Sequence, residues 1–309
     1  MKITVFGTGG VGGYFGARLA QGGADVGFVA RGAQLAALRA GGLTIESPAG
    51  GFALPTVRAS DDPASLGTPD VVFVCVKLWD LDDAIRALTP VVGPGTAVVS
   101  LQNGVQKDDA LRRAFGAKAV MGGVAYIGAS VPRPGVVLQA GTLQRLVFGE
   151  YDGSRSPRAL ALYETCERAG IDAAISPDIR RTIWEKFVFL VGLSAATATM
   201  RASIGPVRTN PRSRAFLLDV MREVVAVGRA HGVRLEQAFA EDRLAFCDGL
   251  PPTMEASMYA DLQRGRRLEL PWLSGAVVEL GSAVGVPTPM NRAVNDILAL
   301  HAGGPPGPR

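Results

Sequence analysis

Lys186 is the residue whose type and setting most favour acid–base chemistry. It is the only lysine after Lys118, and residues 187–200, which follow it, carry no charge. A lysine that borders a buried surface is uncommon, and partial burial lowers the pKa of a lysine toward the range that suits a proton donor. The alternative is a structural lysine, whose aliphatic stem covers an apolar junction while its ammonium group stays in water.

Two further polar residues come after apolar runs that have the composition of buried strands. Lys77 directly follows the run DVVFVCV at residues 70–76, and Asn103 lies just after AVVSL at residues 97–101. In an open α/β sheet, ligands bind beyond the carboxyl ends of the strands, so both side chains are candidates for a binding cleft. A solvated lysine at a strand end and an asparagine in an Asn-Gly turn are the plain alternatives.

The start of the chain predicts a dinucleotide-binding turn. Residues 3–6 are a short apolar stretch, residues 7–12 carry the pattern G-x-G-x-x-G, and residues 14–21 have a helical composition. In such a strand–turn–helix unit the glycines permit the turn, admit a pyrophosphate and bring helix and strand together. The helix start then binds phosphate through its free N–H groups. The residues predicted to bind the cofactor here are Gly7, Gly9, Gly10, Val11 and Gly12.

The residues after the second predicted strand favour NADP(H) over NAD(H). NAD-binding units usually carry an acidic residue at this point for the ribose hydroxyls, whereas this chain reads VARG at residues 29–32. Arg31 is placed to make a bidentate, charge-assisted contact with a 2′-phosphate. Otherwise it is a surface arginine at a helix start, where the helix dipole slightly disfavours a positive charge.

These residues need a scaffold that positions them, and the first half of the chain predicts alternating strands and helices. Such alternation is typical of a parallel, doubly wound sheet, so a Rossmann-type NADP-binding domain is predicted over residues 1–177. Additional antiparallel pieces are expected as a hairpin at 43–46 and 52–57 and as strands at 136–138 and 145–148. The main strands are expected at residues 3–6, 25–30, 70–76, 97–101 and 120–127.

The pattern changes near residue 177, and helical periodicity dominates beyond it. Breaks containing Gly or Pro, such as Gly205-Pro206, separate the helices. A helical substrate-binding and catalytic domain is therefore predicted over residues 178–302, and the segment GGPPGPR at 303–309 is predicted to be a disordered tail. The predicted fold class is α/β, an N-terminal Rossmann-type doubly wound sheet with a C-terminal all-helical domain. The helices are predicted at residues 179–200, 212–231, 235–247, 253–263, 272–284 and 291–300.

Composition narrows the classes of partner. The 309 residues include 32 basic and 28 acidic side chains, without a basic tract interleaved with aromatic residues, so nucleic acid is not an expected partner. No uninterrupted apolar run reaches membrane-spanning length, and the N-terminus enters the predicted fold directly, so neither a membrane partner nor a signal peptide is expected. The widely spaced cysteines Cys75, Cys166 and Cys247 suit reduced core thiols in a cytoplasmic protein.

Metal-dependent chemistry is disfavoured by the scarcity of ligands. The chain has only two histidines, His231 and His301, and no Cys/His cluster has metal-ligand spacing. No metal site is therefore predicted. A zinc-dependent alcohol dehydrogenase and a dehydrogenase with a histidine acid are both disfavoured.

The order and spacing of these features resemble the ketopantoate reductase (2-dehydropantoate 2-reductase) family over nearly the whole chain. The resemblance implies NADP(H)-dependent reduction of a 2-oxo acid to a 2-hydroxy acid, with 2-dehydropantoate as substrate and pantoate, on the route to pantothenate, as product. It also implies that the cofactor lies across the first domain and the substrate between the domains. The matching pieces are the glycine motif, Arg31, Lys77-Leu-Trp79, Gln102-Asn103-Gly104, Trp184-Glu-Lys186, Ser257-Met-Tyr-Ala-Asp261, Glu269 and Gly275.

The resemblance assigns a role to each candidate residue. Lys186 matches the catalytic lysine that protonates the substrate carbonyl oxygen, and Glu269 matches an acidic residue that orients or tunes it. By spacing alone, Glu269 after the basic residues 264–267 is instead a solvated salt bridge. The remaining matches are Asn103 and Lys77 on the nicotinamide and substrate side of the cleft, Ser257 at the substrate carboxylate and Arg31 at the cofactor 2′-phosphate.

The chain departs from the family on the helix face that follows Lys186. The family usually has asparagines four and eight residues after the lysine, where this chain has Leu190 and Ser194, and Pro271 and Ser274 replace polar residues after the glutamate. Leucine cannot hydrogen-bond, and serine is shorter, so another branched 2-oxo acid or an imine is an alternative substrate. A non-catalytic NADP-binding sensor is an alternative of another class, disfavoured by the retained lysine and glutamate. A homodimer also stays open.

Overall fold

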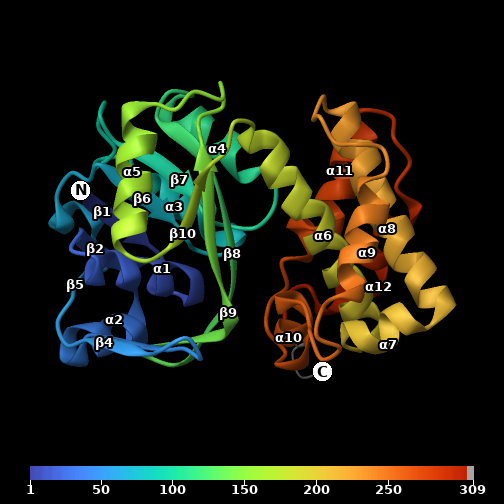
Figure 1. Cartoon of the computed structure of the whole chain (residues 1–309), viewed down its shortest axis with the longest axis horizontal. Helices are drawn as coiled ribbons and strands as arrows, with labels where there is room; N and C mark the ends of the chain where they lie inside the picture. Colours follow the sequence, from blue (N-terminus) through green and yellow to red (C-terminus); the bar gives the residue numbers. More distant parts are fainter. Residues whose placement is uncertain (305–309) are drawn as a thin grey trace. The chain divides into compact units, whose positions relative to one another are not determined.

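The computed structural model describes residues 1–304 and divides the chain into two compact units (Figure 1). Residues 1–103 and 107–182 form the first unit, and residues 104–106 with the chain from Ile183 onward form the second. All strands of the described residues belong to the first unit, and the second is helical. The predicted fold class is therefore confirmed. The limits 1–177 and 178–302 remain predictions about functional domains, and residues 305–309 of the predicted tail lie outside the described residues.

Parallel strands form the centre of the first unit, in the order β5-β2-β1-β6-β7-β8. The chain adds β2 on one side of β1 and β6 on the other, so the strand order reverses between β1 and β6. In open α/β sheets a ligand crevice lies at such a reversal, outside the carboxyl ends of the strands. The strands are β1 (Lys2–Phe6), β2 (Asp25–Val29), β5 (Arg58–Ser60), β6 (Val71–Val74), β7 (Ala97–Ser100) and β8 (Val120–Arg133).

The central strands are continuously apolar because both faces of the sheet are covered. Along β6, Val71 and Phe73 pack into one buried cluster, whereas Val72 and Val74 pack into the other. Alternate side chains point to opposite faces of a strand, so two apolar faces require an unbroken apolar run. The helices of this unit are α1 (Gly10–Gln21), α2 (Gly32–Gly41), α3 (Leu81–Leu88), α4 (Lys107–Phe115) and α5 (Pro157–Arg168).

A long antiparallel hairpin extends the sheet beyond its parallel part. Strand β8 pairs with β9 (Val136–Gly149) along most of its length, with register shifts near Gly128 and Arg133. Only short pieces of β9 were predicted, because its middle residues lack the apolar alternation of a strand; pairing with β8 fixes them in extended form. The strands that add to β9 or its neighbours are β3 (Leu43–Glu46), β4 (Phe52–Leu54) and β10 (Asp172–Ile175).

The second unit packs its helices around one large apolar cluster. The six helices predicted here are present, α6 with the predicted ends and the others with shifted ends. The predicted break at Gly205-Pro206 is wrong, because it lies inside α7. A proline in the first turn of a helix removes no intrahelical hydrogen bond, so it permits this helix. The helices are α6 (Ile179–Met200), α7 (Ile204–Thr209), α8 (Pro211–Ala230), α9 (Phe239–Asp248), α10 (Ser257–Gln263), α11 (Ser274–Ala283) and α12 (Pro289–Leu298).

Helix α6 is unusually apolar for its length. Among residues 1–304 it is the one helix that is long and apolar enough to cross a membrane by length and composition, although Glu185 and Lys186 interrupt its apolar run. Of its most apolar window, 67% is buried inside the structure. Core helices give the same signal, and Val188 and Val191 of α6 are fully buried in the apolar cluster.

Candidate active site

Two positions accept only glycine, one in the turn between β1 and α1 and one in the first turn of α1. Gly7 has a φ of +104°, and a Cβ added there would lie 2.7 Å from the Val76 nitrogen. A Cβ on Gly12 would lie 2.2 Å from the Gly7 carbonyl oxygen, closer than real side chains approach. The turn therefore packs directly against the end of β6, and the start of α1 packs directly against the turn.

Gly9 differs from its neighbours because space lies beside it. A Cβ added to Gly9 would meet no atom within 4 Å, and no side chain caps the amides of the first turn of α1. Free N–H groups at the positive end of a helix dipole bind phosphate. The first turn, with Gly10 and Val11, thus fits a dinucleotide pyrophosphate. Gly10 also packs against β8, where its Cβ would lie 2.5 Å from the Ala129 oxygen.

A glutamine that sequence reasoning missed holds this turn in place. Gln34 of α2 donates from Nε2 to the Thr8 carbonyl at 3.0 Å, and its Oε1 accepts from the Gly135 nitrogen at 3.0 Å. Thr8 in turn donates from Oγ1 to the Val29 carbonyl at 3.0 Å. Partners 26 and 101 residues away leave no local sequence signal. The glycine turn, the end of β2 and the β8–β9 turn therefore form one connected structure.

Arg31 lies at the carboxyl end of β2, where the ribose of a dinucleotide is bound in this type of sheet. It is the residue before the first turn of α2, its side chain is exposed, and within the described residues it forms no hydrogen bond or ion pair. Arg39, on the same helix, is by contrast paired with Asp61 at 3.7 Å. A cationic group without an internal partner is available for a phosphate, but a solvated arginine has the same geometry.

Lys77 and Asn103 meet at one edge of the sheet. They follow the neighbouring strands β6 and β7, whose last residues, Val74 and Ser100, are paired in register. Both side chains are half-buried, and Lys77 Nζ lies 5.5 Å from the centre of the Trp79 ring. The structure therefore places both candidates beyond the carboxyl ends of adjacent strands.

Helix α6 presents the other predicted residues along one face. Lys186, Leu190 and Ser194 follow at intervals of four residues, which places them on the same side of the helix. Lys186 and Leu190 are half-buried, whereas Ser194 is 1% exposed and its hydroxyl has no hydrogen-bond partner within the described residues. An unpaired buried hydroxyl is costly, so a water or ligand group is expected to bind it.

Glu269 is buried, which does not fit a solvated surface ion pair. The residue is 5% exposed and immediately precedes the short helical turn Leu270–Trp272. Ser274, at the start of α11, also has a buried hydroxyl without a hydrogen-bond partner among the described residues. Ser257 is exposed at the first position of α10, and Asp261 one turn later lies 3.9 Å from Arg266.

The candidates thus fall into two sets that belong to different units. The glycine turn, Arg31, Lys77 and Asn103 are in the first unit, and Lys186, Leu190, Ser194, Ser257 and Glu269 are in the second. The two sets differ in the chemical groups that they provide. The first set offers phosphate-binding backbone and cations at strand ends, and the second offers a half-buried amine, a buried carboxyl group and hydroxyls.

The cysteines are free and unsuited to nucleophilic chemistry. Burial raises the pKa of the Cys75 thiol, although the charge of Lys107 opposes this shift. Burial raises the pKa of Cys166 to about 12 and that of Cys247 to about 11. A nucleophilic cysteine needs a lowered pKa, so none of the three is a candidate catalytic group.

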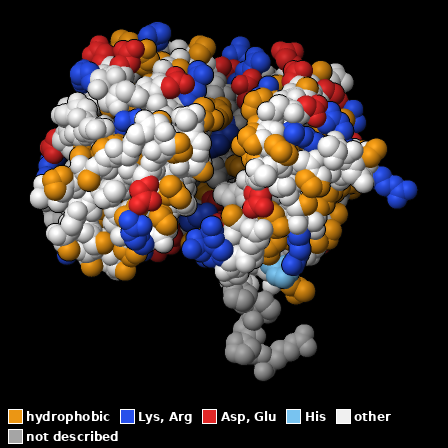
Figure 2. Space-filling model, turned by 60° about the horizontal axis from the view of Figure 1, so that its bottom comes forward, with side chains coloured by type: hydrophobic (Ala, Val, Ile, Leu, Met, Phe, Trp, Pro, Cys, Tyr) orange, Lys and Arg blue, Asp and Glu red, His pale blue; other side chains and the backbone are white. Residues whose placement is uncertain are grey.

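On the face seen in Figure 2, basic and acidic side chains are interspersed with apolar ones rather than gathered in regions of one sign. Within residues 1–304, no group of three or more His, Cys, Asp and Glu side chains is arranged to hold a metal ion.

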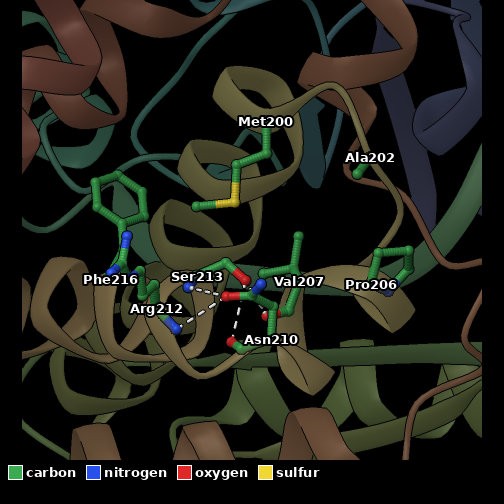
Figure 3. Close-up of a pocket in the computed structure, with 8 residues that line it drawn as sticks. All are labelled: Met200, Ala202, Pro206, Val207, Asn210, Arg212, Ser213 and Phe216. Carbon is green, nitrogen blue, oxygen red and sulfur yellow. Dashed lines mark hydrogen bonds between the residues drawn. The ribbon is translucent and has the colours of Figure 1, made fainter.

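A hollow of about 480 Å³ in the second unit is separate from the candidate residues (Figure 3). It lies where α6 ends and α7 and α8 begin. Asn210 Oδ1 accepts from the Arg212 and Ser213 amides, and Ser213 Oγ donates to the Val207 carbonyl. Its polar groups therefore cap and join helices, and no candidate catalytic residue lines it.

Comparison with family models assigns nearly the whole chain. Residues 3–153 match the model described as ketopantoate reductase PanE/ApbA, and residues 178–302 match the model of the C-terminal region of the same family. A structural neighbour with lower identity, a D-mandelate dehydrogenase solved with NADH, shares the fold at 19% identity and a TM-score of 0.88.

Similar proteins and solved structures carry names that agree with these family models. A 2-dehydropantoate 2-reductase of Mesorhizobium japonicum is 33% identical, with 97% of this chain and 96% of that protein covered. A ketopantoate reductase structure from Ralstonia eutropha superimposes with a TM-score of 0.89 at 31% identity, covering 98% of each chain. A further structure, of a putative ketopantoate reductase from Ralstonia solanacearum, gives 0.88 at 35% identity over 97% of each chain. The chain therefore belongs to the ketopantoate reductase PanE/ApbA family of oxidoreductases.

Proposed function

We propose that this enzyme uses NADPH to reduce 2-dehydropantoate to pantoate, a step toward pantothenate. The observation that carries the proposal is the glycine turn with open space at Gly9, in a chain whose relatives bear the name 2-dehydropantoate 2-reductase. The half-buried Lys186 and the buried Glu269 add the acid–base pair that such a reduction needs.

The first unit holds the cofactor in this proposal. The first-turn amides of α1 bind the pyrophosphate, and Arg31 binds the 2′-phosphate that distinguishes NADPH from NADH. Lys77 and Asn103, beyond the ends of β6 and β7, bind on the nicotinamide side. The bound cofactor supplies the hydride that reduces the carbonyl carbon.

The second unit supplies the proton and binds the substrate. Lys186 donates a hydrogen bond to the carbonyl oxygen and transfers its proton to that oxygen as negative charge develops there, which completes the hydroxyl group. Glu269 orients the ammonium group of Lys186, and Ser257 binds the substrate carboxylate. The neutral amine then regains a proton from water.

A panel of 2-oxo acids tests this proposal. Purified enzyme is mixed with NADPH or NADH and each acid, and cofactor oxidation is followed by absorbance. Turnover of 2-dehydropantoate with NADPH, and slower turnover with NADH, is the expected result. Turnover of no 2-oxo acid would favour the non-catalytic sensor, and turnover of other acids alone would reassign the substrate.

A further inference from the structure

A buried amide connects the two loops that carry Lys77 and Asn103. Gln102 Oε1 accepts from Ser100 Oγ at 2.9 Å, and Gln102 Nε2 donates to the Val76 carbonyl at 2.9 Å. Val76 immediately precedes Lys77, and Gln102 immediately precedes Asn103. One side chain, 7% exposed, therefore links the carboxyl ends of β6 and β7.

A buried lysine secures the same edge from α4. Lys107 Nζ donates to the Ser100 carbonyl at 2.9 Å and to the Gly123 carbonyl at 3.2 Å, and it lies 3.3 Å from Asp108 Oδ1. Tyr151 donates to Asp108 Oδ2 at 2.7 Å. The Lys107 side chain is 1% exposed, so this charge pair is held almost without water.

The contacts of Gln102 and Lys107 are more elaborate than is needed to hold β6 and β7 together. At the amino-terminal edge of the same strands, a single hydroxyl does the equivalent work, because Thr96 Oγ1 donates to the Pro69 carbonyl at 2.9 Å. Buried ion pairs are often no more stabilising than apolar residues of similar size. The charged, fully hydrogen-bonded arrangement is at the carboxyl edge, where an open α/β sheet binds its ligand.

We propose that Gln102 and Lys107 are positioning residues: Gln102 fixes Lys77 and Asn103 relative to each other, and Lys107 holds the end of β7, which precedes Asn103, against β8. The proposal rests on the proposed function, because it gives those two side chains a place at the cofactor. Neither Gln102 nor Lys107 touches the reacting atoms. Their effect is on the geometry of the groups that do, and small misplacements of such groups reduce turnover strongly.

A matched pair of variants tests the role of Gln102. Gln102→Met removes the link at the carboxyl edge, and Thr96→Val removes the link of equal length at the amino edge. We expect kcat to fall about tenfold to a hundredfold in Gln102→Met, with comparable losses of Tm in both variants. A difference in kcat smaller than about fivefold between the two variants overturns the proposal.

Two substitutions of Lys107 test its role, one that removes the charge and one that retains it. Lys107→Met leaves Asp108 without its cation, whereas Lys107→Arg keeps a buried donor and a charge. We expect kcat to fall in the Met variant and to recover in part in the Arg variant, with KM for the oxo acid changed less than kcat. Equal kcat in the Met and Arg variants contradicts the role of Lys107.

Amide hydrogen exchange separates this proposal from the proposed function. It needs no substrate, so it applies even if the wild type reduces no 2-oxo acid. Exchange in residues 75–78 and 101–103 should be faster in Gln102→Met than in the wild type or Thr96→Val. Unchanged exchange in both segments overturns the positioning role, whatever the activity measurements show.

Discussion

The glycine turn and the face of α6 represent two ways of building a candidate site. In the turn, chemistry comes from the backbone, and an added Cβ at Gly7 or Gly12 would overlap neighbouring atoms. On α6, chemistry comes from the side chains of Lys186, Leu190 and Ser194, and a regular helix fixes only their spacing. Backbone sites tolerate almost no change, whereas a helix face can change its ligand with one substitution.

This difference predicts how function diverges in the molecule. The first unit keeps its backbone geometry, and so the class of cofactor it can bind, for steric reasons. The second unit is expected to lose or gain hydrogen-bonding groups without a change of fold, because a position such as Leu190 on a regular helix can carry either an apolar or a polar side chain. Substrate preference is therefore expected to vary more readily than the use of a dinucleotide.

The largest effect is expected at the acid on α6. Lys186→Met should leave NADPH binding largely intact but lower turnover by about 10²–10⁴, the usual effect of removing a positioned acid or base. Steady-state kinetics and cofactor fluorescence measure the two quantities. Lys118→Met, at an exposed lysine of the first unit, is the control and should leave both unchanged. Near-normal turnover in Lys186→Met would eliminate the mechanism.

The next effect tests whether a side chain in the first unit discriminates between cofactors. Arg31→Ala should weaken NADPH binding by about 1.5–3 kcal/mol, the scale of a charged hydrogen bond, and leave NADH binding nearly unchanged. Arg39→Ala, on the same helix but paired with Asp61, is the control. Equal losses for both cofactors would show that Arg31 does not bind the 2′-phosphate.

Substitutions at Gly9 and Gly12 allow the loss of NADPH affinity to be measured separately from the loss of stability. Gly9→Ala should weaken NADPH binding by about 1–3 kcal/mol, because the methyl group occupies the space for the pyrophosphate, while Tm stays the same. Gly12→Ala should lower both Tm and binding, because its Cβ would lie 2.2 Å from the Gly7 oxygen. Calorimetry and thermal melts give both values. Full NADPH affinity in Gly9→Ala would place the phosphates elsewhere.

The helix face should show a comparable effect on substrate choice. An unmade buried hydrogen bond costs about 1–3 kcal/mol, so Leu190 should leave the wild type only weakly selective for 2-dehydropantoate over branched 2-oxo acids without its hydroxyl. Leu190→Asn should shift kcat/KM toward the hydroxylated acid. A wild-type preference of about 10³ or more for 2-dehydropantoate would mean that other residues make these contacts.

The smallest effect is expected at Glu150, a carboxylate that belongs to neither set of candidate site residues. Its substitution shows how far a change in stability alone alters the protein. Burial alone raises the pKa of Glu150, but hydrogen bonds from Arg158 and Ser156 outweigh it and hold that pKa below its usual 4.5. The stabilisation is therefore present above about pH 5 and is lost as the pH falls below 4.5. Glu150→Gln should lower stability by about 1–2 kcal/mol at pH 7, and the difference should shrink as the pH falls below 4.5 and through the lowered pKa of Glu150. A difference independent of pH would contradict the assignment.

Local patterns were sufficient to predict much of this molecule. The turn at residues 7–12 was predictable because its glycine spacing between an apolar stretch and a helical segment is a local pattern, although the atoms that Gly7 and Gly10 face lie far along the chain. The run at residues 70–76 predicted a strand covered on both faces because every other side chain serves a different cluster. The helix at 179–200 was predictable from its helical periodicity and from the absence of charge over residues 187–200.

Long-range contacts were not predictable from such patterns. The Lys107 ammonium is buried by carbonyls of two strands, although its own sequence neighbourhood is that of an exposed helix start. Glu269 follows a basic stretch, yet it is buried. In both cases the environment is set by elements distant in sequence, which periodicity does not reveal. The roles of the candidate residues stay predictions until they are tested.

The link through Gln34 has a consequence for which insertions the chain can accept. The tip of a β-hairpin is normally where extra residues are tolerated best. Here the hairpin tip at Gly135 is tied through Gln34 to Thr8, and the Gly135 carbonyl accepts from the Thr44 nitrogen at 2.9 Å. Lengthening this tip would displace the glycine turn, so natural variation in loop length should avoid residues 133–136 and occur instead at 47–51, where the chain is largely exposed.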